Sequence, residues 1–430
     1  MADAGREAAA TSGRIESAGY RGLVLVMLLL VYTFNFIDRQ ILGILALPIK
    51  AEFQLTDTQL GLLSGIAFAL FYTALGIPIA WLADRKSRTA IITVSLALWS
   101  LFTALCGVAG NFWQLFLARL GVGVGEAGGV APTYALIADY FPRASRAKAL
   151  AFYSLGIPIG SALGILLGGW IAATVDWRVA FISVGVAGLV LAPIFRLVVK
   201  EPVRGRFDPP QADAAAPPFR AVLSLLRRKP SFWLLAFGAS CSSIVGYGML
   251  FWTVSFFART FDLPPITVSQ IVGGITFVGG VAGVWAGGWL GDRLGASNPA
   301  AYGRVPALAY LIAVPFYVTG LLVHNLPVTI LLFVVPVALA LVWLGPVITA
   351  VQHLVPPSMR ATASATFLFV NNLIGIGMGP LIIGFISDRL APQFGSDALR
   401  YSILCVLVFY LLAAALMALA SRHLAKDWND

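Results

Sequence analysis

Twelve apolar segments follow one another along the 430-residue chain, separated by short polar loops rich in Asp, Asn, Pro or Arg. A helix of roughly 20 apolar residues crosses the hydrocarbon core of a bilayer. Inside lipid, the backbone groups of an isolated segment must be satisfied within that segment, so each is expected to be helical. We therefore predict twelve membrane-spanning helices, near residues 23–47, 59–83, 89–109, 112–140, 147–173, 178–199, 230–257, 267–291, 304–323, 327–354, 361–387 and 400–421.

Composition supports an all-α membrane protein. Hydrophobic residues make up 59% of the chain and charged residues only 11%, whereas a soluble domain carries about 25% charged residues. The net charge of +10 would suggest a nucleic-acid partner in a soluble protein, but here it reflects orientation. Most Lys and Arg residues fall in loops on the side of the N-terminus; the other side carries Lys50, Arg178, Arg259, Arg389 and Arg400. Because positive loops stay inside, we expect both termini in the cytoplasm, a bacterial inner membrane and no nucleic-acid partner.

The cysteines and histidines indicate neither a disulfide framework nor a metal site. Cys106, Cys241 and Cys405 stand alone in apolar segments, and the three histidines are scattered. Residues 1–20 are polar and do not resemble a signal peptide, because the apolar segment that follows is too long for one and contains charges. We expect no cofactor and no metal.

The longest polar interval, residues 200–229, contains five prolines and divides the chain into two halves of six segments. The predicted domains are a disordered cytoplasmic tail (1–20), an N-terminal six-helix bundle (21–199), a cytoplasmic linker (200–229), a C-terminal six-helix bundle (230–422) and a second tail (423–430). The end of the linker mixes Leu and Val with Arg. This pattern favours either a short helix lying on the inner leaflet or a basic loop that obeys the inside rule.

An internal repeat supports the division into halves. The second segment ends with AWLADR at residues 80–85, and the eighth ends with GWLGDR at residues 288–293. Four of these six positions are identical. The same tag at the same place in each half predicts two parallel repeats around a central cavity.

Four ionisable residues interrupt the apolar segments of the first half. Asp38 and Arg39 lie just past the middle of the first segment, and Arg119 and Glu126 lie two helical turns apart on one face of the fourth. A charge at such a place costs about 2.5–3.5 kcal/mol. The alternatives are a mutually neutralised structural cluster and a protonation site with its counter-charges. The second half has no ionisable residue near the middle of a segment.

The chain resembles the major facilitator superfamily in the loop signatures that follow the second and eighth segments. Four further strings resemble its Spinster-like branch: FIDR at 36–39, GIPIA at 76–80, RLGVGVGEA at 119–127 and DYFP at 139–142. The resemblance implies two pseudo-symmetric six-helix bundles and the export of lysophospholipids, sphingosine-1-phosphate or related amphiphiles. One departure is Ser87, where the superfamily usually has Gly, which puts the tightness of that turn in question.

The loop signatures are expected to form a cytoplasmic gate. An acid at a helix end can accept hydrogen bonds from the free N–H groups that start a neighbouring helix, and arginines can bridge to facing carboxylates. Ordinary charges reaching for the membrane surface are the alternative. The predicted gate residues are Asp84, Arg85, Arg88, Asp292 and Arg293.

Two rows of glycine recur at every fourth residue, a spacing that lets helix backbones approach closely. We predict that the fifth and eighth segments cross along these rows and form a hinge between the halves, with packing inside one half as the alternative. The residues are Gly156, Gly160 and Gly164 in the fifth segment, and Gly279, Gly283 and Gly287 in the eighth.

The hypothesis is a proton-coupled secondary active transporter that works by alternating access and moves a lipid-like amphiphile. Asp38 and Glu126 would carry or sense protons; Arg39 and Arg119 would be their counter-charges, and Arg119 would also grip an anionic headgroup. The second half would supply an apolar cavity wall with a few polar groups, drawn from Tyr247, Trp252, Trp343, Asn371 and Asn372.

An alternative on the same fold is a proton-coupled transporter of small organic anions such as sugar acids, with Arg119 binding the carboxylate. A membrane enzyme is disfavoured because the chain has no Gly-x-Ser-x-Gly, His-Glu-x-x-His or nucleotide loop. A sensor or scaffold is disfavoured by the short tails. We expect a monomer whose partners are its amphiphilic substrate and membrane lipid.

Overall fold

The computed structural model describes residues 17–83, 85–207, 219–295, 298–356 and 359–428, and the regular elements in these ranges are helices. The tail predicted at residues 1–20 therefore lies almost wholly outside the described residues. The first bundle comprises α2 (Ala18–Ile44), α3 (Ala46–Phe53), α4 (Asp57–Ser64), α5 (Ile66–Ala83), α6 (Arg88–Cys106), α7 (Phe112–Glu126), α8 (Val130–Tyr140), α9 (Arg143–Ser154), α10 (Gly156–Thr174) and α11 (Trp177–Val198).

The rest of the chain forms a short connecting helix and the second bundle. These elements are α12 (Phe219–Arg227), α13 (Pro230–Phe261), α14 (Pro265–Gly295), α15 (Ala301–Leu322), α16 (Leu326–Leu339), α17 (Leu344–His353), α18 (Arg360–Phe394), η2 (Gly395–Asp397), α19 (Ala398–Val406) and α20 (Val408–Asp427). The final helix continues to Asp427, so most of the segment predicted as a second tail is helical.

The described helices make twelve membrane crossings, as predicted. Ten stretches are long and apolar enough to span a bilayer, and the last of them, Thr362–Asp427, turns back at η2 and makes two crossings. A further crossing consists of α7 and α8, which a break at residues 127–129 separates. This break follows Glu126 directly, so a functional candidate lies where the helix is interrupted.

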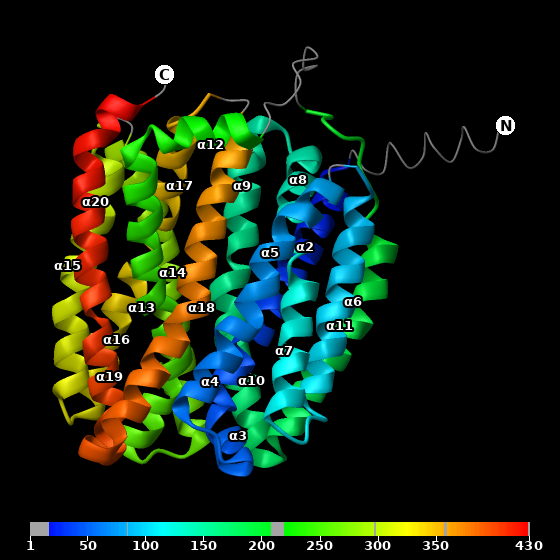
Figure 1. Cartoon of the computed structure of the whole chain (residues 1–430). Helices are drawn as coiled ribbons and strands as arrows, with labels where there is room; N and C mark the ends of the chain where they lie inside the picture. Colours follow the sequence, from blue (N-terminus) through cyan, green and yellow to red (C-terminus); the bar gives the residue numbers. More distant parts are fainter. Residues whose placement is uncertain (1–16, 84, 208–218, 296–297, 357–358, 429–430) are drawn as a thin grey trace.

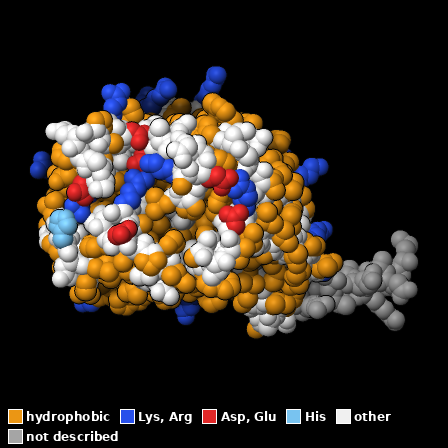
Figure 2. Space-filling model, turned by 90° about the horizontal axis from the view of Figure 1, so that it is seen from below, with side chains coloured by type: hydrophobic (Ala, Val, Ile, Leu, Met, Phe, Trp, Pro, Cys, Tyr) orange, Lys and Arg blue, Asp and Glu red, His pale blue; other side chains and the backbone are white. Residues whose placement is uncertain are grey.

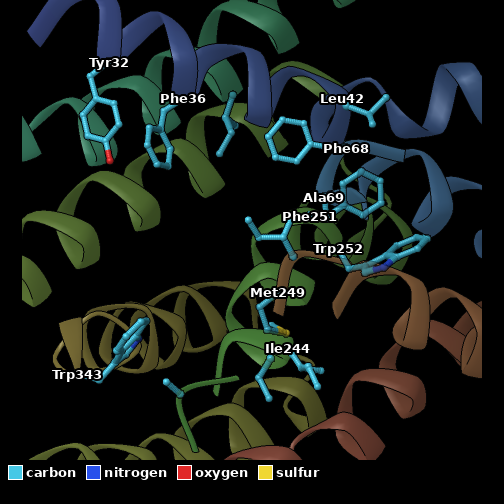
Figure 3. Close-up of a cluster of buried hydrophobic side chains, with 14 of the residues drawn as sticks. Tyr32, Phe36, Leu42, Phe68, Ala69, Ile244, Met249, Phe251, Trp252 and Trp343 are labelled. Carbon is cyan, nitrogen blue, oxygen red and sulfur yellow. The ribbon is translucent and has the colours of Figure 1, made fainter. Parts of the chain in front are cut away.

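The two bundles stand side by side with their helices roughly parallel, while α12 lies across one end (Figure 1). We call the end at which α2 begins and α20 ends the terminal end, and the opposite end the distal end. Buried aromatic side chains from both bundles, among them Phe36, Phe68 and Phe251, lie close together between the bundles (Figure 3). Contacts between the bundles join α10 to α14, α4 and α5 to α18, and α2 to α13.

The prediction that the fifth and eighth segments cross is correct, but the glycine rows do not make the crossing. A methyl group on Gly160 or Gly164 would overlap the backbone of α2, and one on Gly283 or Gly287 would overlap or crowd the backbone at the C-terminal end of α16 and just beyond it. Gly156 likewise faces Tyr32 of α2, and Gly279 faces α16. The rows therefore pack helices within each bundle, because backbone approach is needed there. The α10–α14 contact uses other glycines: Gly169, Gly273 and Gly280.

Candidate functional site

A small cavity lies between the two bundles, lined in part by two of the buried charges, Arg39 and Arg119. The first bundle contributes residues from α2, α4, α5 and α7, and the second contributes residues from α13 and α18. The lining residues are Phe36, Arg39, Gln40, Ser64, Phe68, Arg119, Tyr247, Leu250, Phe251, Ile376 and Pro380.

The four ionisable residues predicted from the first half come together beside this cavity. Arg39 Nε lies 2.8 Å from Glu126 Oε2, and Arg119 Nη1 lies 3.7 Å from Asp38 Oδ2. Asp38, Arg119 and Glu126 are each at most 2% exposed. Two acids and two bases at these distances neutralise each other, which lowers the cost of keeping them out of water.

Pairing within the cluster is incomplete. Arg119 Nε and Nη1, Asp38 Oδ2 and Glu126 Oε1 are buried, and none has a hydrogen-bond partner among the described residues. Buried polar groups without partners are costly, so these atoms mark a place where a proton, a water molecule or a ligand can be accommodated.

Arg39 is held by aromatic rings as well as by Glu126. Its guanidinium carbon lies 4.9 Å from the centre of the Phe68 ring, 4.7 Å from that of Tyr72 and 5.2 Å from that of Phe36. Cation–π contacts favour a cation over an aromatic face within about 6 Å. These rings would therefore keep the guanidinium of Arg39 near the cavity even when Glu126 becomes protonated and neutral.

Thr103 on α6 gives Asp38 a partner that suits either protonation state. Its hydroxyl oxygen lies 2.6 Å from Asp38 Oδ1 and 2.9 Å from the carbonyl oxygen of Trp99. A hydroxyl has one proton to donate and can also accept. It donates to an ionised Asp38; when Asp38 is protonated, Thr103 accepts from it and donates to Trp99. Thr103 was not predicted, because a helical threonine that donates to the backbone carbonyl one turn earlier is common and does not by itself mark a site.

The polar groups predicted for the second half mostly lie away from the cavity. Tyr247 lines it. Trp252 is buried and donates to the carbonyl oxygen of Pro380, at 2.8 Å. Asn371 accepts a hydrogen bond from Ser243 and donates weakly to Asn372, and Trp343 packs against Phe367. Trp252, Trp343 and Asn371 thus join helices within the second bundle, whereas Asn372 contacts its neighbour on α18. Gln40, Ser64 and Pro380 line the cavity and were not predicted.

The predicted gate residues differ in their surroundings. Arg88 is buried and contacts Asp139 and Glu201. Arg85 is exposed; it stacks on Trp81 and donates to the carbonyl oxygen of that residue. Arg293 likewise stacks on Trp289. Asp84 lies outside the described residues, and of Asp292 the structure gives only its place in α14.

Glu201, just after α11, performs the capping role expected of Asp84. It accepts hydrogen bonds from the backbone N–H of Thr89, at 2.9 Å, and from the hydroxyls of Ser87 and Thr89. Partial burial acts in the opposite direction, but these hydrogen bonds hold the pKa of Glu201 below its ordinary value. One feature of the sequence could have identified Glu201: it is an acid that directly follows a membrane segment, at the end of the molecule where most loop charges are positive.

Comparisons with known proteins agree with this geometry. Residues 28–380 match the model of the Major Facilitator Superfamily. The chain is 35% identical to an MFS-type efflux pump of Mycolicibacterium smegmatis over 93% of its own length and 92% of that protein. It is 32% identical to human protein spinster homolog 1, over 94% of this chain and 81% of the relative.

Solved structures of a bacterial homologue of the human lysosomal transporter Spinster are also similar. The inward-facing, unoccupied form superposes with a TM-score of 0.86 at 32% identity, covering 96% of this chain and 99% of that one. The inward-facing, occupied form gives a TM-score of 0.83 over the same coverage.

Proposed function

This chain belongs to the Spinster branch of the Major Facilitator Superfamily, a family of multi-pass membrane transporters rather than enzymes, and on that premise we propose that it couples proton movement to transport of an anionic amphiphile. Its two bundles would rock about the central cavity and expose it to each side in turn. The proton gradient would drive this cycle without a cofactor.

The observation that carries the proposal is the polarity of the cavity. Arg39 and Arg119 line the side formed by the first bundle, and Arg119 keeps two buried nitrogen atoms without a hydrogen-bond partner among the described residues. Leu250, Phe251 and Ile376 line the side formed by the second bundle. An anionic headgroup would satisfy the free Arg119 donors, while an acyl or sphingoid chain would lie against the apolar wall.

The acids supply a means of coupling. While Glu126 is ionised, it holds Arg39 at 2.8 Å; a proton on Glu126 would weaken that ion pair and free Arg39 to bind an anion. In the same way, a proton on Asp38 would weaken its ion pair with Arg119 and free Arg119 to bind an anion. Because the four groups interact closely, they would titrate as a unit. A proton supplies about 1.4 kcal/mol per pH unit and about 2.3 kcal/mol per 100 mV, enough to shift a conformational equilibrium of a few kcal/mol.

Orientation follows from charge. The terminal end carries most of the lysines and arginines, so by the positive-inside rule we place it, with both termini, in the cytoplasm, as in a bacterial inner membrane. The hydrogen bonds that join described residues of the two bundles gather at the distal end. The conformation would accordingly face inward, and transport would begin with substrate entering from the cytoplasm or the inner leaflet.

A transporter of small organic anions remains the second candidate, because the cavity is modest in volume and holds two arginines. Both candidates can be tested in proteoliposomes with an imposed pH gradient, using lysophosphatidylglycerol and glucuronate as probes. We expect gradient-driven movement of the lysolipid in the wild type. Movement of glucuronate alone would select the second candidate.

The coupling assignment is tested with the Asp38→Asn and Glu126→Gln variants in the same assay. Both should lose the response to the gradient. Glu52→Gln is the matched control, because Glu52 is also a carboxylate paired with an arginine of the first bundle, Arg178, yet belongs to α3 at the distal end and does not line the cavity. If the two site variants respond to the gradient as the wild type does, the coupling assignment is wrong.

A further inference from the structure

At the distal end, an ion pair joins the two bundles across the seam between them. Arg259, near the end of α13, donates from Nη1 and Nη2 to the two carboxylate oxygens of Asp57, both at 2.7 Å. Asp57 is the first residue of α4 and is 3% exposed. Lys50 and Ser387 also donate to its carboxylate. Parallel, two-pronged contacts of this kind are the strongest hydrogen bonds between charged side chains.

A second acid from the opposite bundle completes the first turn of α4. Asp388 on α18 accepts hydrogen bonds from the backbone N–H groups of Asp57, at 2.9 Å, and Thr58, at 2.7 Å. The side chain of the helix's own N-cap, Thr56, accepts only from the backbone N–H of Gln59. The first N–H groups of a helix have no partner within the helix. Here, the other bundle supplies that partner, so α4 is fully capped only while the distal end is closed.

The backbones of α4 and α18 touch directly below these contacts. A methyl group on Gly61 would lie 2.5 Å from the carbonyl oxygen of Pro380, and one on Gly65 would lie 2.5 Å from that of Gly377. Gly384 meets the backbone of Asp57. Seen from this end, acidic and basic side chains gather near the middle of the face, with hydrophobic side chains around them (Figure 2). The polar contacts thus lie over a close-packed seam that water does not enter without separating the bundles.

We propose that Asp57, Arg259 and Asp388 form a releasable distal latch that sets how often the distal side of the transporter opens. Lys50 and Arg259 balance the two acids, so the closed latch carries no net charge. Opening exchanges these contacts for water and leaves the backbone N–H groups of Asp57 and Thr58 without the partner that Asp388 supplies. The latch rests on the alternating-access part of the proposed function, but not on the identity of the substrate or on proton coupling.

The test measures the distance between the bundles at the distal end. Ala51 on α3 and Gln393 on α18 are both exposed there. In a background with Cys106, Cys241 and Cys405 replaced, spin labels at Ala51→Cys and Gln393→Cys report the separation by pulsed electron resonance in detergent or nanodiscs. The wild type should give a short-distance population with a minor longer one.

Asp57→Asn, Arg259→Gln and Asp388→Ala should each raise the ratio of long to short distances by at least about tenfold, because hydrogen bonds to charged groups contribute more than that factor. Glu52→Gln is the control, since it breaks a distal ion pair inside one bundle and should leave the distances unchanged. Distances unchanged from the wild type in latch variants that elute as intact protein would overturn the proposal. Neither substrate nor a pH gradient is present, so the latch can fail while proton coupling stands.

Discussion

Arg88 Nη1 lies 2.6 Å from Asp139 Oδ2, and both side chains are only 6% exposed. This ion pair joins the start of α6, which is the third crossing, to the end of the fourth crossing, at the terminal end of the first bundle. The guanidinium Nε also donates to Glu201, at 3.1 Å. Of the arginines of the predicted gate, Arg88 therefore holds three segments of one bundle together, whereas Arg85 lies on the surface.

We expect Arg88→Gln to destabilise the protein and Arg85→Gln to leave it nearly unchanged. Removing one member of a buried pair costs about 3–5 kcal/mol, because the partner is left charged and buried. An exposed substitution away from such a pair changes stability by about 0.5 kcal/mol or less. Thermal unfolding of the purified proteins, followed by tryptophan fluorescence, compares the two. Equal Tm values for both variants would contradict the assignment.

The Glu201 carboxylate predicts a pH dependence of stability. Its pKa is below its ordinary value in the folded protein, so its contribution is fully present above the ordinary pKa of about 4.3 and is lost as the pH falls through the lower folded value. We expect Glu201→Gln to have a lower Tm than the wild type at pH 7, and the difference to shrink below about pH 4.3. Tm series from pH 7 to pH 3 test this. A difference that stays constant, or grows as the pH falls, would show that the hydrogen bonds to Thr89 and Ser87 do not stabilise the charged form.

The positions of the glycines in the two rows make a further prediction about packing. Gly160→Ala should destabilise the contact between α10 and α2, because the new methyl group would overlap the carbonyl oxygen of Thr33. Gly274→Ala is the matched control, since nothing lies within 4 Å of that position and alanine favours the helix by about 1 kcal/mol. We therefore expect a lower Tm for the first variant and an unchanged or higher Tm for the second. A Gly160→Ala protein as stable as the wild type would mean that α2 and α10 have room to separate.

The sequence predicted the positions of the helices well, but it predicted less well which helices pack against one another. Apolar length alone located the twelve crossings, because a membrane allows few other structures, and buried charges located the cluster around Asp38 and Glu126. Glycines at every fourth residue indicate that another helix approaches closely along each row. The spacing does not say which helix approaches, and for this reason the rows were wrongly placed between the bundles. Glu201 and Asp388 act on helices far from them in the sequence, and no local pattern reveals such a partner.

The hydroxyl of Thr103 provides the sharpest test of the buried cluster. Thr103→Val keeps the shape of the side chain but removes the group 2.6 Å from Asp38, so an ionised Asp38 loses a donor and a protonated Asp38 loses an acceptor. We expect gradient-driven transport to fall in this variant and to recover in Thr103→Ser. Thr93→Val is the control: Thr93 also lies on α6 and bonds a backbone carbonyl one turn back, that of Thr89. Because Thr103 bonds Trp99 in the same way, an equal loss in both valine variants would indicate that only the backbone bond matters. A loss specific to Thr103 that serine restores would tie the effect to Asp38.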